Sequence, residues 1–144
     1  MQLDETDQKL LTLLRDNARA PVAQLARRLG LARTTVQARI ERLENTGAIV
    51  GYTLRTGAAT RAPLRATVLI SIEPRSGPVV LGRLKSLPGV ETVHTTSGRF
   101  DLLVQVTAAT TSELDDTLDH IGEARGVRSS ESLIHLATKI DRTR

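Results

Sequence analysis

The sequence predicts an α+β protein with two domains, a winged helix-turn-helix domain followed by a ferredoxin-like domain of order β-α-β-β-α-β. Apolar residues recur at helical spacing up to about residue 45, whereas several apolar runs after residue 64 alternate as strands do. The stretch RTGAATRAP between the two parts is small, polar and unpatterned. We therefore expect domains at residues 1–54 and 64–144, joined by a linker at residues 55–63.

The composition is that of a folded globular protein and not of a disordered tail. Of the 144 residues, 40% are hydrophobic and 25% are charged, and there is no cysteine, which excludes disulfides and thiolate chemistry. Asp4, Glu5 and Asp7 stand where a secretory signal would be basic. No apolar run approaches the roughly 18 residues that a membrane span requires. We expect a cytoplasmic protein with no membrane partner.

Three helices are expected in the first domain. The first begins around Leu3–Glu5, where acidic side chains suit the positive end of the helix dipole, and the second begins at Pro21. Gly30 ends the second helix, the third covers residues 32–45, and residues 48–55 change to β-like composition. The residues expected to face the core are Leu10, Leu11, Leu14, Ala18, Val22, Leu25, Ala26, Leu29, Val36, Ile40 and Leu43.

The third helix has a short polar face opposite its apolar residues. Small side chains let a helix settle into the major groove of DNA, threonine and glutamine bond base edges, and arginine binds phosphate or guanine. Two helices joined by a glycine-containing turn, with such a face on the second, predict binding to double-stranded DNA. The predicted DNA-binding residues are Thr34, Thr35, Gln37, Ala38, Arg39 and Arg42 on the outer face and flanks, with Arg27, Arg28 and Arg33 as phosphate contacts.

Charge is distributed unevenly along the chain. The net charge is +4, but residues 15–42 alone hold seven arginines and two acidic residues, and residues 17–40 hold no acidic residue. A local basic excess is typical of a surface that binds a polyanion. The alternative is a three-helix bundle that packs on a partner protein and never contacts nucleic acid.

Six elements are expected in the second segment. The first strand alternates, with apolar residues such as Ala66 and Val68 on one face, and the first helix carries Val80 and Leu84 at helical spacing. Strands are expected at residues 65–73, 90–98, 100–108 and 127–140, and helices at residues 78–89 and 112–126. This order places both helices on one face of a single sheet.

The open face of that sheet is expected to carry an interface. The aliphatic residues assigned to it are Leu69, Val93, Leu103, Ile134 and Leu136. So many aliphatic side chains on a nominally exposed face are typical of an interface. We expect a second copy of the chain to cover it, since two recognition helices must reach DNA half-sites about 34 Å apart.

The alternative function is enzymatic: the chain would be a ferredoxin-like enzyme that binds a small molecule and carries an appended helical domain. His94, Ser97 and Asp101 lie close together in the sequence, but no nucleophile elbow surrounds them. The three histidines are not at metal-ligand spacing, and there is no glycine-rich phosphate loop. We therefore expect no catalytic residue, no metal and no cofactor.

The stretch LDETDQKLLTLLRDNARAPVAQLARRLGLARTTVQARIERLENTGAIVGYTL resembles the N-terminal domain of the leucine-responsive/asparagine regulator (Lrp/AsnC) family. The shared elements are Leu3-Asp4 with Asp7, Leu13-Leu14, Arg19, Leu25-Ala26, Gly30-Leu31, Val36, Arg39-Ile40, Leu43-Glu44 and Gly47. The second segment resembles the ligand-sensing domain of that family. The resemblance implies a sequence-specific transcription regulator that dimerises through its C-terminal sheets, commonly assembles into octamers or other rings, and in many members responds to an amino acid.

The resemblance also implies an effector site at the turn between the second and third strands. The matching residues are Ser97, Gly98, Arg99, Phe100 and Asp101. Backbone amides near Gly98 suit a carboxylate and Asp101 suits an ammonium group; the alternative is a structural turn in which Asp101 caps backbone. Two positions depart from the family pattern: Ala32-Arg33 replaces the usual Ser-Pro, and Arg99 replaces a residue that is acidic in many members.

Overall fold

The computed structural model describes residues 2–57, 59–60 and 63–143. The chain divides into two compact units, built mainly on Met1–Arg55 and on Thr56–Asp141. Of the expected linker at residues 55–63, residues 58, 61 and 62 lie outside the described residues, and the others form neither helix nor strand. No helix in the described part of the chain is long and apolar enough to cross a membrane.

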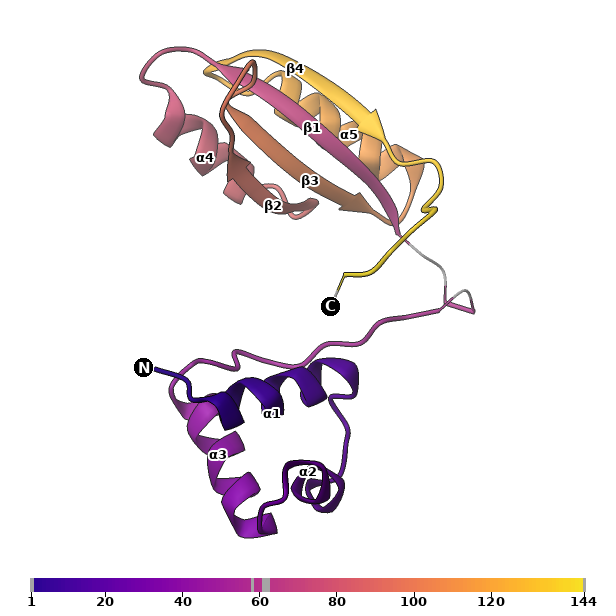
Figure 1. Cartoon of the computed structure of the whole chain (residues 1–144). Helices are drawn as coiled ribbons and strands as arrows, with labels where there is room; N and C mark the ends of the chain where they lie inside the picture. The colour runs from indigo at the N-terminus through magenta and orange to yellow at the C-terminus, as the bar shows by residue number, and fades with distance from the viewer. Residues whose placement is uncertain (1, 58, 61–62, 144) are drawn as a thin grey trace. The chain divides into compact units, whose positions relative to one another are not determined.

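Three helices build the N-terminal unit: α1 (Glu5–Asp16), α2 (Val22–Leu29) and α3 (Arg33–Asn45) (Figure 1). A reciprocal capping box fixes the start of α1. The Asp4 carboxylate accepts a hydrogen bond from the Asp7 N–H at 2.8 Å, and the Asp7 carboxylate accepts one from the Asp4 N–H at 3.3 Å. Two of the N–H groups at this end are thereby satisfied by side chains.

The three helices enclose an aliphatic core. Its buried members are Leu10, Leu11, Leu14, Leu25, Ala26, Val36 and Leu43, and Val22, Leu29 and Ile40 pack against them. All ten were expected to face inward. The prediction for Ala18 was wrong, because α1 ends at Asp16 and the chain turns at the extended residue Asn17, which leaves Ala18 exposed.

The turn between α2 and α3 is the feature that makes the pair a helix-turn-helix. Gly30 ends α2 in the left-handed region, at φ 68° and ψ 34°, as predicted. The Leu31 N–H donates to the carbonyl of Ala26 at 3.0 Å, which satisfies one of the last carbonyls of α2. Two residues later Arg33 begins α3, the second helix of the motif.

Residues 48–55 do not form the β-structure expected of a wing. Ala48 and Ile49 form a bend, residues 50–55 belong to no ladder, and no strand occurs among residues 2–55. Extended backbone becomes a strand only where a second segment pairs with its N–H and C=O groups. Apolar side chains along it remain exposed, with Val50 and Leu54 at 97% and 83%.

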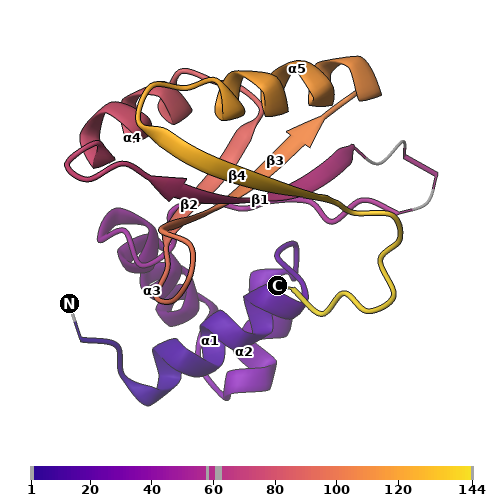
Figure 2. The ribbon, with the colours of Figure 1, turned by 90° about the horizontal axis from the view of Figure 1, so that it is seen from above.

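The C-terminal unit has the predicted β-α-β-β-α-β order. Its elements are β1 (Leu64–Ile72), α4 (Gly77–Lys85), β2 (Val90–Thr95), β3 (Leu102–Ala108), α5 (Thr111–Gly122) and β4 (Val127–Ile134). The strands pair antiparallel in the order β2-β3-β1-β4. Figure 2 shows α4 and α5 on one face of the sheet, so the fold is α+β with a ferredoxin-like second domain.

The last strand is shorter than predicted. It ends at Ile134 instead of reaching residue 140, although the His135 N–H still donates to the Arg65 carbonyl at 2.9 Å. The strand that β4 pairs with, β1, begins at Leu64, and continuing the register of Ala66 with Ile134 sets Leu64 opposite Leu136, so β1 offers no partner to the residues after Leu136. Pairing with a neighbour sets the length of a strand, whatever its own composition favours.

Strand register corrects two of the residues assigned to the open face. Val93 lies opposite Val104 and Ile134 lies opposite Ala66, and both partners are buried on the helix-covered face. In β2 an irregularity between Val90 and Thr92 shifts the phase of the alternation, which brings both valines of this strand to the core. Opposite residues of antiparallel strands share a face, so these two predictions were wrong.

Candidate nucleic-acid interface

The outer face of α3 has the character that the sequence predicted. Val36 and Leu43 are fully buried against the core, and Thr34 and Thr35 on the other side are exposed. Gln37 and Ala38 are exposed as well. A shallow depression on this face is lined by Thr34, Thr35, Ala38, Arg39 and Arg42. The helix therefore presents short, uncharged side chains between arginines, and their contact with DNA stays a prediction.

Three arginines of α2 and α3 form no ion pair with the acidic residues that the structure describes. Arg27 and Arg28 lie in the last turn of α2 and Arg33 is the first residue of α3, and all three are exposed. Among the described residues, no ion pair joins any of them to an acidic side chain. Their full charge is available to an anionic partner.

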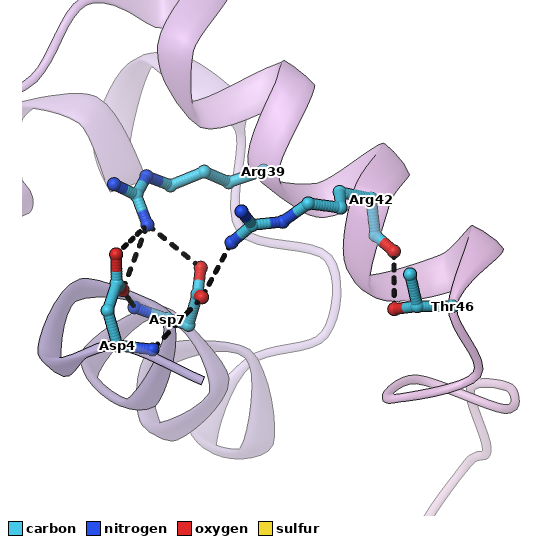
Figure 3. A network of polar contacts seen from close by, with 5 residues as sticks. All are labelled: Asp4, Asp7, Arg39, Arg42 and Thr46. Carbon is cyan, nitrogen blue, oxygen red and sulfur yellow. Dashed lines mark hydrogen bonds and ion pairs between the residues drawn. The ribbon is translucent and has the colours of Figure 1, made fainter. Parts of the chain in front are cut away.

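The other two arginines of α3 are held by acidic residues of the N-terminal segment. Figure 3 shows Arg39 and Arg42 pointing toward Asp4 and Asp7. One Arg39 nitrogen, Nη1, donates to both Asp4 oxygens at 2.9 and 2.8 Å and to Asp7 Oδ1 at 3.0 Å. The Nη2 atom of Arg42 lies 2.6 Å from Asp7 Oδ2. These four residues, called here the carboxylate clamp, tie α3 to the start of α1.

Asp7 is the most buried member of the clamp. Its side chain has no exposed area, whereas the side chains of Arg39 and Arg42 are 25% and 50% exposed. A buried carboxylate is strongly destabilising unless it is paired and hydrogen-bonded. Here two guanidinium groups and the Asp4 N–H meet that requirement.

The clamp also shifts the titration of two of its members. The hydrogen bond from Arg39 holds the pKa of Asp4 below its usual value, with help from the Asp7 N–H. Hydrogen bonds to Asp4 and then to Asp7 raise the pKa of the Arg39 guanidinium. Both shifts favour the charged forms, so Asp4 and Arg39 face each other as an ion pair at neutral pH.

The clamp is a feature that the sequence patterns did not show. Asp4 and Asp7 were taken only as acidic residues suited to a helix N-terminus, and Arg39 and Arg42 only as DNA contacts. The partners stand 32 to 35 residues apart, far beyond any helical spacing. The one available signal was that Asp4, Asp7 and Arg39 all belong to the set of residues shared with the Lrp/AsnC family.

The predicted effector turn is a well-bonded link between β2 and β3. Gly98 lies at its tip with φ 106°, and the Arg99 guanidinium lies 5.2 Å from the centre of the Phe100 ring. Asp101 anchors the turn to the end of β1: its Oδ2 accepts a hydrogen bond from the Ile72 N–H at 2.8 Å, and its own N–H donates to the Ile70 carbonyl. Asp101 thus has the backbone-capping role of the structural alternative, and Ser97, Gly98 and Arg99 remain exposed.

The open face of the sheet carries a smaller apolar patch than predicted. Leu69 and Leu103 lie opposite each other on it, and Leu133 lies opposite Thr67 and is 49% exposed. The Thr67 hydroxyl is within hydrogen-bond distance of Gln105 Oε1, at 3.1 Å, and of His135 Nε2, at 2.8 Å. We call Leu69, Leu103 and Leu133 the open-face leucines.

Family comparisons match both units. Residues 3–44 match the AsnC-type helix-turn-helix domain, and residues 65–144 match the Lrp/AsnC ligand binding domain. An uncharacterised HTH-type transcriptional regulator of Pyrococcus horikoshii is 35% identical over 141 residues, covering 94% of each chain. The HTH-type transcriptional regulator LysM of Saccharolobus solfataricus is 32% identical over 137 residues, covering 94% of this chain and 95% of its own.

Solved structures agree with these relatives. E. coli AsnC superposes with a TM-score of 0.86 at 25% identity, over 100% of this chain and 99% of its own. A feast or famine regulatory protein from M. tuberculosis, complexed with L-methionine, superposes with a TM-score of 0.82 at 32% identity, over 99% and 98%. These similar proteins are regulators, so the enzyme alternative is not supported. The chain belongs to the Lrp/AsnC family of transcription regulators.

Proposed function

We propose that this regulator reads double-stranded DNA with the outer face of α3. The observation that carries the proposal is an exposed row of uncharged side chains on the second helix of a helix-turn-helix: the polar Thr34, Thr35 and Gln37, and the small Ala38. Such side chains let a helix enter the major groove and bond base edges. The domains are proposed as residues 1–54 for DNA and 64–144 for assembly and sensing, with a linker at 55–63.

The arginines are proposed to divide into two groups. Arg27, Arg28 and Arg33 are exposed and unpaired among the described residues, so they are the phosphate contacts of the proposal. Arg39 and Arg42 line the depression on the outer face of α3 but are bound to Asp4 and Asp7. A guanidinium has five N–H groups, so both retain donors with which to flank the bound duplex.

Thr35→Ala tests the base-reading face. A duplex is first selected from a random pool with the wild-type chain, and the affinity of each variant is then measured for it. Losing one base contact is expected to weaken binding by roughly 5- to 150-fold, which corresponds to about 1–3 kcal/mol. Thr12→Ala is the matched control, because Thr12 is exposed on α1 and donates to the Gln8 carbonyl. Equal affinity of the two variants would mean that another surface of the protein contacts the bases.

The open-face leucines are proposed to bind a second copy of the chain. Leu69 and Leu103 are adjacent, Leu133 is half exposed, and no helix of this unit covers that face. Burial of such apolar surface contributes about 25 cal/mol per Å². A dimer also suits the DNA, since two recognition helices then reach both half-sites of a roughly palindromic operator.

Leu103→Glu tests the dimer. A carboxylate introduced into an apolar interface is expected to reduce the mass measured by light scattering to that of one chain. Ser112→Glu on α5 introduces the same group on an exposed position of the helix layer and serves as control. An unchanged mass for Leu103→Glu would place the contact on another surface.

We further propose that dimers join into an octamer or another ring and that an amino acid binds at residues 97–101. The support is the M. tuberculosis relative, which is complexed with L-methionine, and the exposed turn around Gly98. The carboxylate of Asp101 is then shared between the Ile72 N–H and the ligand ammonium group. Light scattering and DNA affinity, measured across a panel of amino acids that includes L-methionine, test this. Constant values across the panel would reject sensing.

A further inference from the structure

The carboxylate clamp neutralises part of the surface that is proposed to bind DNA. α2 and α3 carry five arginines, Arg27, Arg28, Arg33, Arg39 and Arg42. Two of them are matched by the carboxylates of Asp4 and Asp7, so the four clamp residues sum to zero formal charge. The other three arginines form no ion pair with any acidic residue in the described ranges.

The geometry of the clamp makes this neutralisation hard to reverse. Asp7 is fully buried, and each of its oxygens is bound by a different arginine, at 3.0 Å for Arg39 and 2.6 Å for Arg42. An approaching phosphate cannot displace this carboxylate without leaving it buried and unpaired, which is strongly unfavourable. The exposed partner, Asp4, holds the same Arg39 nitrogen from the other side.

We propose that Asp7, supported by Asp4, is a positioning residue that fixes Arg39 and Arg42 beside the recognition face and withholds their charge from the DNA backbone. The proposal rests on the proposed DNA-binding function. Phosphate contacts strengthen binding to every sequence alike, whereas base contacts discriminate between sequences. The clamp therefore lowers non-specific affinity and raises the ratio of operator to random-sequence affinity.

The salt dependence of binding measures how many arginine charges meet phosphate. Each phosphate neutralised by an available cation adds about 0.9 to the slope of log K against log salt. Asp7→Asn and Asp4→Asn each remove one clamp carboxylate and are expected to steepen the slope by up to about 0.9. Between 50 and 200 mM salt, one added charge corresponds to about a 3.5-fold larger loss of affinity. Affinity for a random duplex at 50 mM salt is expected to rise, and the preference for the selected duplex to fall.

Glu5→Gln is the matched control for both variants. It makes the same change in net charge at the start of α1, but Glu5 forms its ion pair, among the described residues, with the exposed Lys9. Its slope is expected to equal that of the wild type. A mere loss of stability does not steepen the slope of a folded protein, so this readout separates positioning from a structural role. Folding of each variant is checked by circular dichroism.

A second pair of variants keeps the test decisive if Asp7→Asn does not fold. Arg27→Gln is expected to flatten the slope by about 0.9, because Arg27 is unpaired, and Arg42→Gln by less than half as much. Equal flattening by these two variants, or equal slopes for Asp4→Asn and Glu5→Gln, would overturn the inference. If the wild type itself shows no salt-dependent duplex binding, the proposed function fails instead, and the two failures are thus distinct.

Discussion

The start of α3 lacks a side-chain cap, and Ala32→Ser is expected to stabilise the N-terminal unit. Ala32 holds the N-cap position at φ −70° and ψ 149°, extended backbone like that of Asp4 before α1 and Thr110 before α5. In those two caps a side-chain oxygen accepts from the N–H three residues on, at 2.8 and 3.1 Å. Ala32→Ser places a hydroxyl in the same relation to the Thr35 N–H.

The expected gain is about 1 kcal/mol in the free energy of unfolding, the usual difference between alanine and serine at an N-cap. Ala32 is exposed, so the added oxygen displaces no neighbour. For a unit of this size, about 1 kcal/mol raises Tm by roughly 4–8 °C. The same substitution within the helix, Ala38→Ser, is expected to lower stability by about 0.5 kcal/mol, because serine is the poorer helix former.

Calorimetry and far-UV circular dichroism of the full chain, at one fixed protein concentration, measure both variants. The two substitutions are chemically identical and lie on one helix, so opposite signs isolate the effect of the cap. A Tm shift below about 1 °C for Ala32→Ser, or shifts of the same sign for both variants, would refute the reasoning.

Three further predictions concern stability and titration. Gly126→Ala is expected to destabilise the C-terminal unit by about 2–4 kcal/mol, because φ there is +93° and a Cβ would lie 2.7 Å from the Ser76 Cβ and 3.0 Å from the Val80 Cγ2. Urea unfolding checks this, and adding Ser76→Gly should recover only the part of the loss that comes from the clash with Ser76. Burial raises the pKa of Tyr52 above its ordinary value, so this tyrosine, the only one in the chain, should ionise late in an absorbance titration at high pH. The pKa of Tyr52 is higher in the folded than in the unfolded chain. The contribution of Tyr52 to stability is therefore complete below its unfolded-state pKa and is lost as pH rises through its folded-state pKa. Arg39 lowers the pKa of Asp4. The contribution of Asp4 to stability is therefore present above the ordinary pKa of 3.8 and is lost as pH falls through the folded-state pKa. Asp4→Asn should make the free energy of unfolding depend less steeply on pH in the acid range. An unchanged acid limb would mean that the ion pair does not form in solution.

Local pattern was sufficient for most of the architecture. The spacing of residues such as Leu25 and Val36 predicted the helices and their buried faces, and Gly30 marked the turn between α2 and α3. The alternation in residues 65–73 predicted β1 and its core face. These features were accessible because helical and strand periodicity are properties of residues within a few positions of each other.

The tertiary structure decided everything that depends on distant partners. Which face Val93 and Ile134 occupy follows from register with β3 and β1, and residues 48–55 are not a strand because nothing in the described part of their unit pairs with them. The pairing of Asp7 with Arg39 and Arg42 joins residues more than 30 positions apart. Sequence spacing carries no signal for such contacts, because packing in three dimensions alone brings these charges within hydrogen-bond distance.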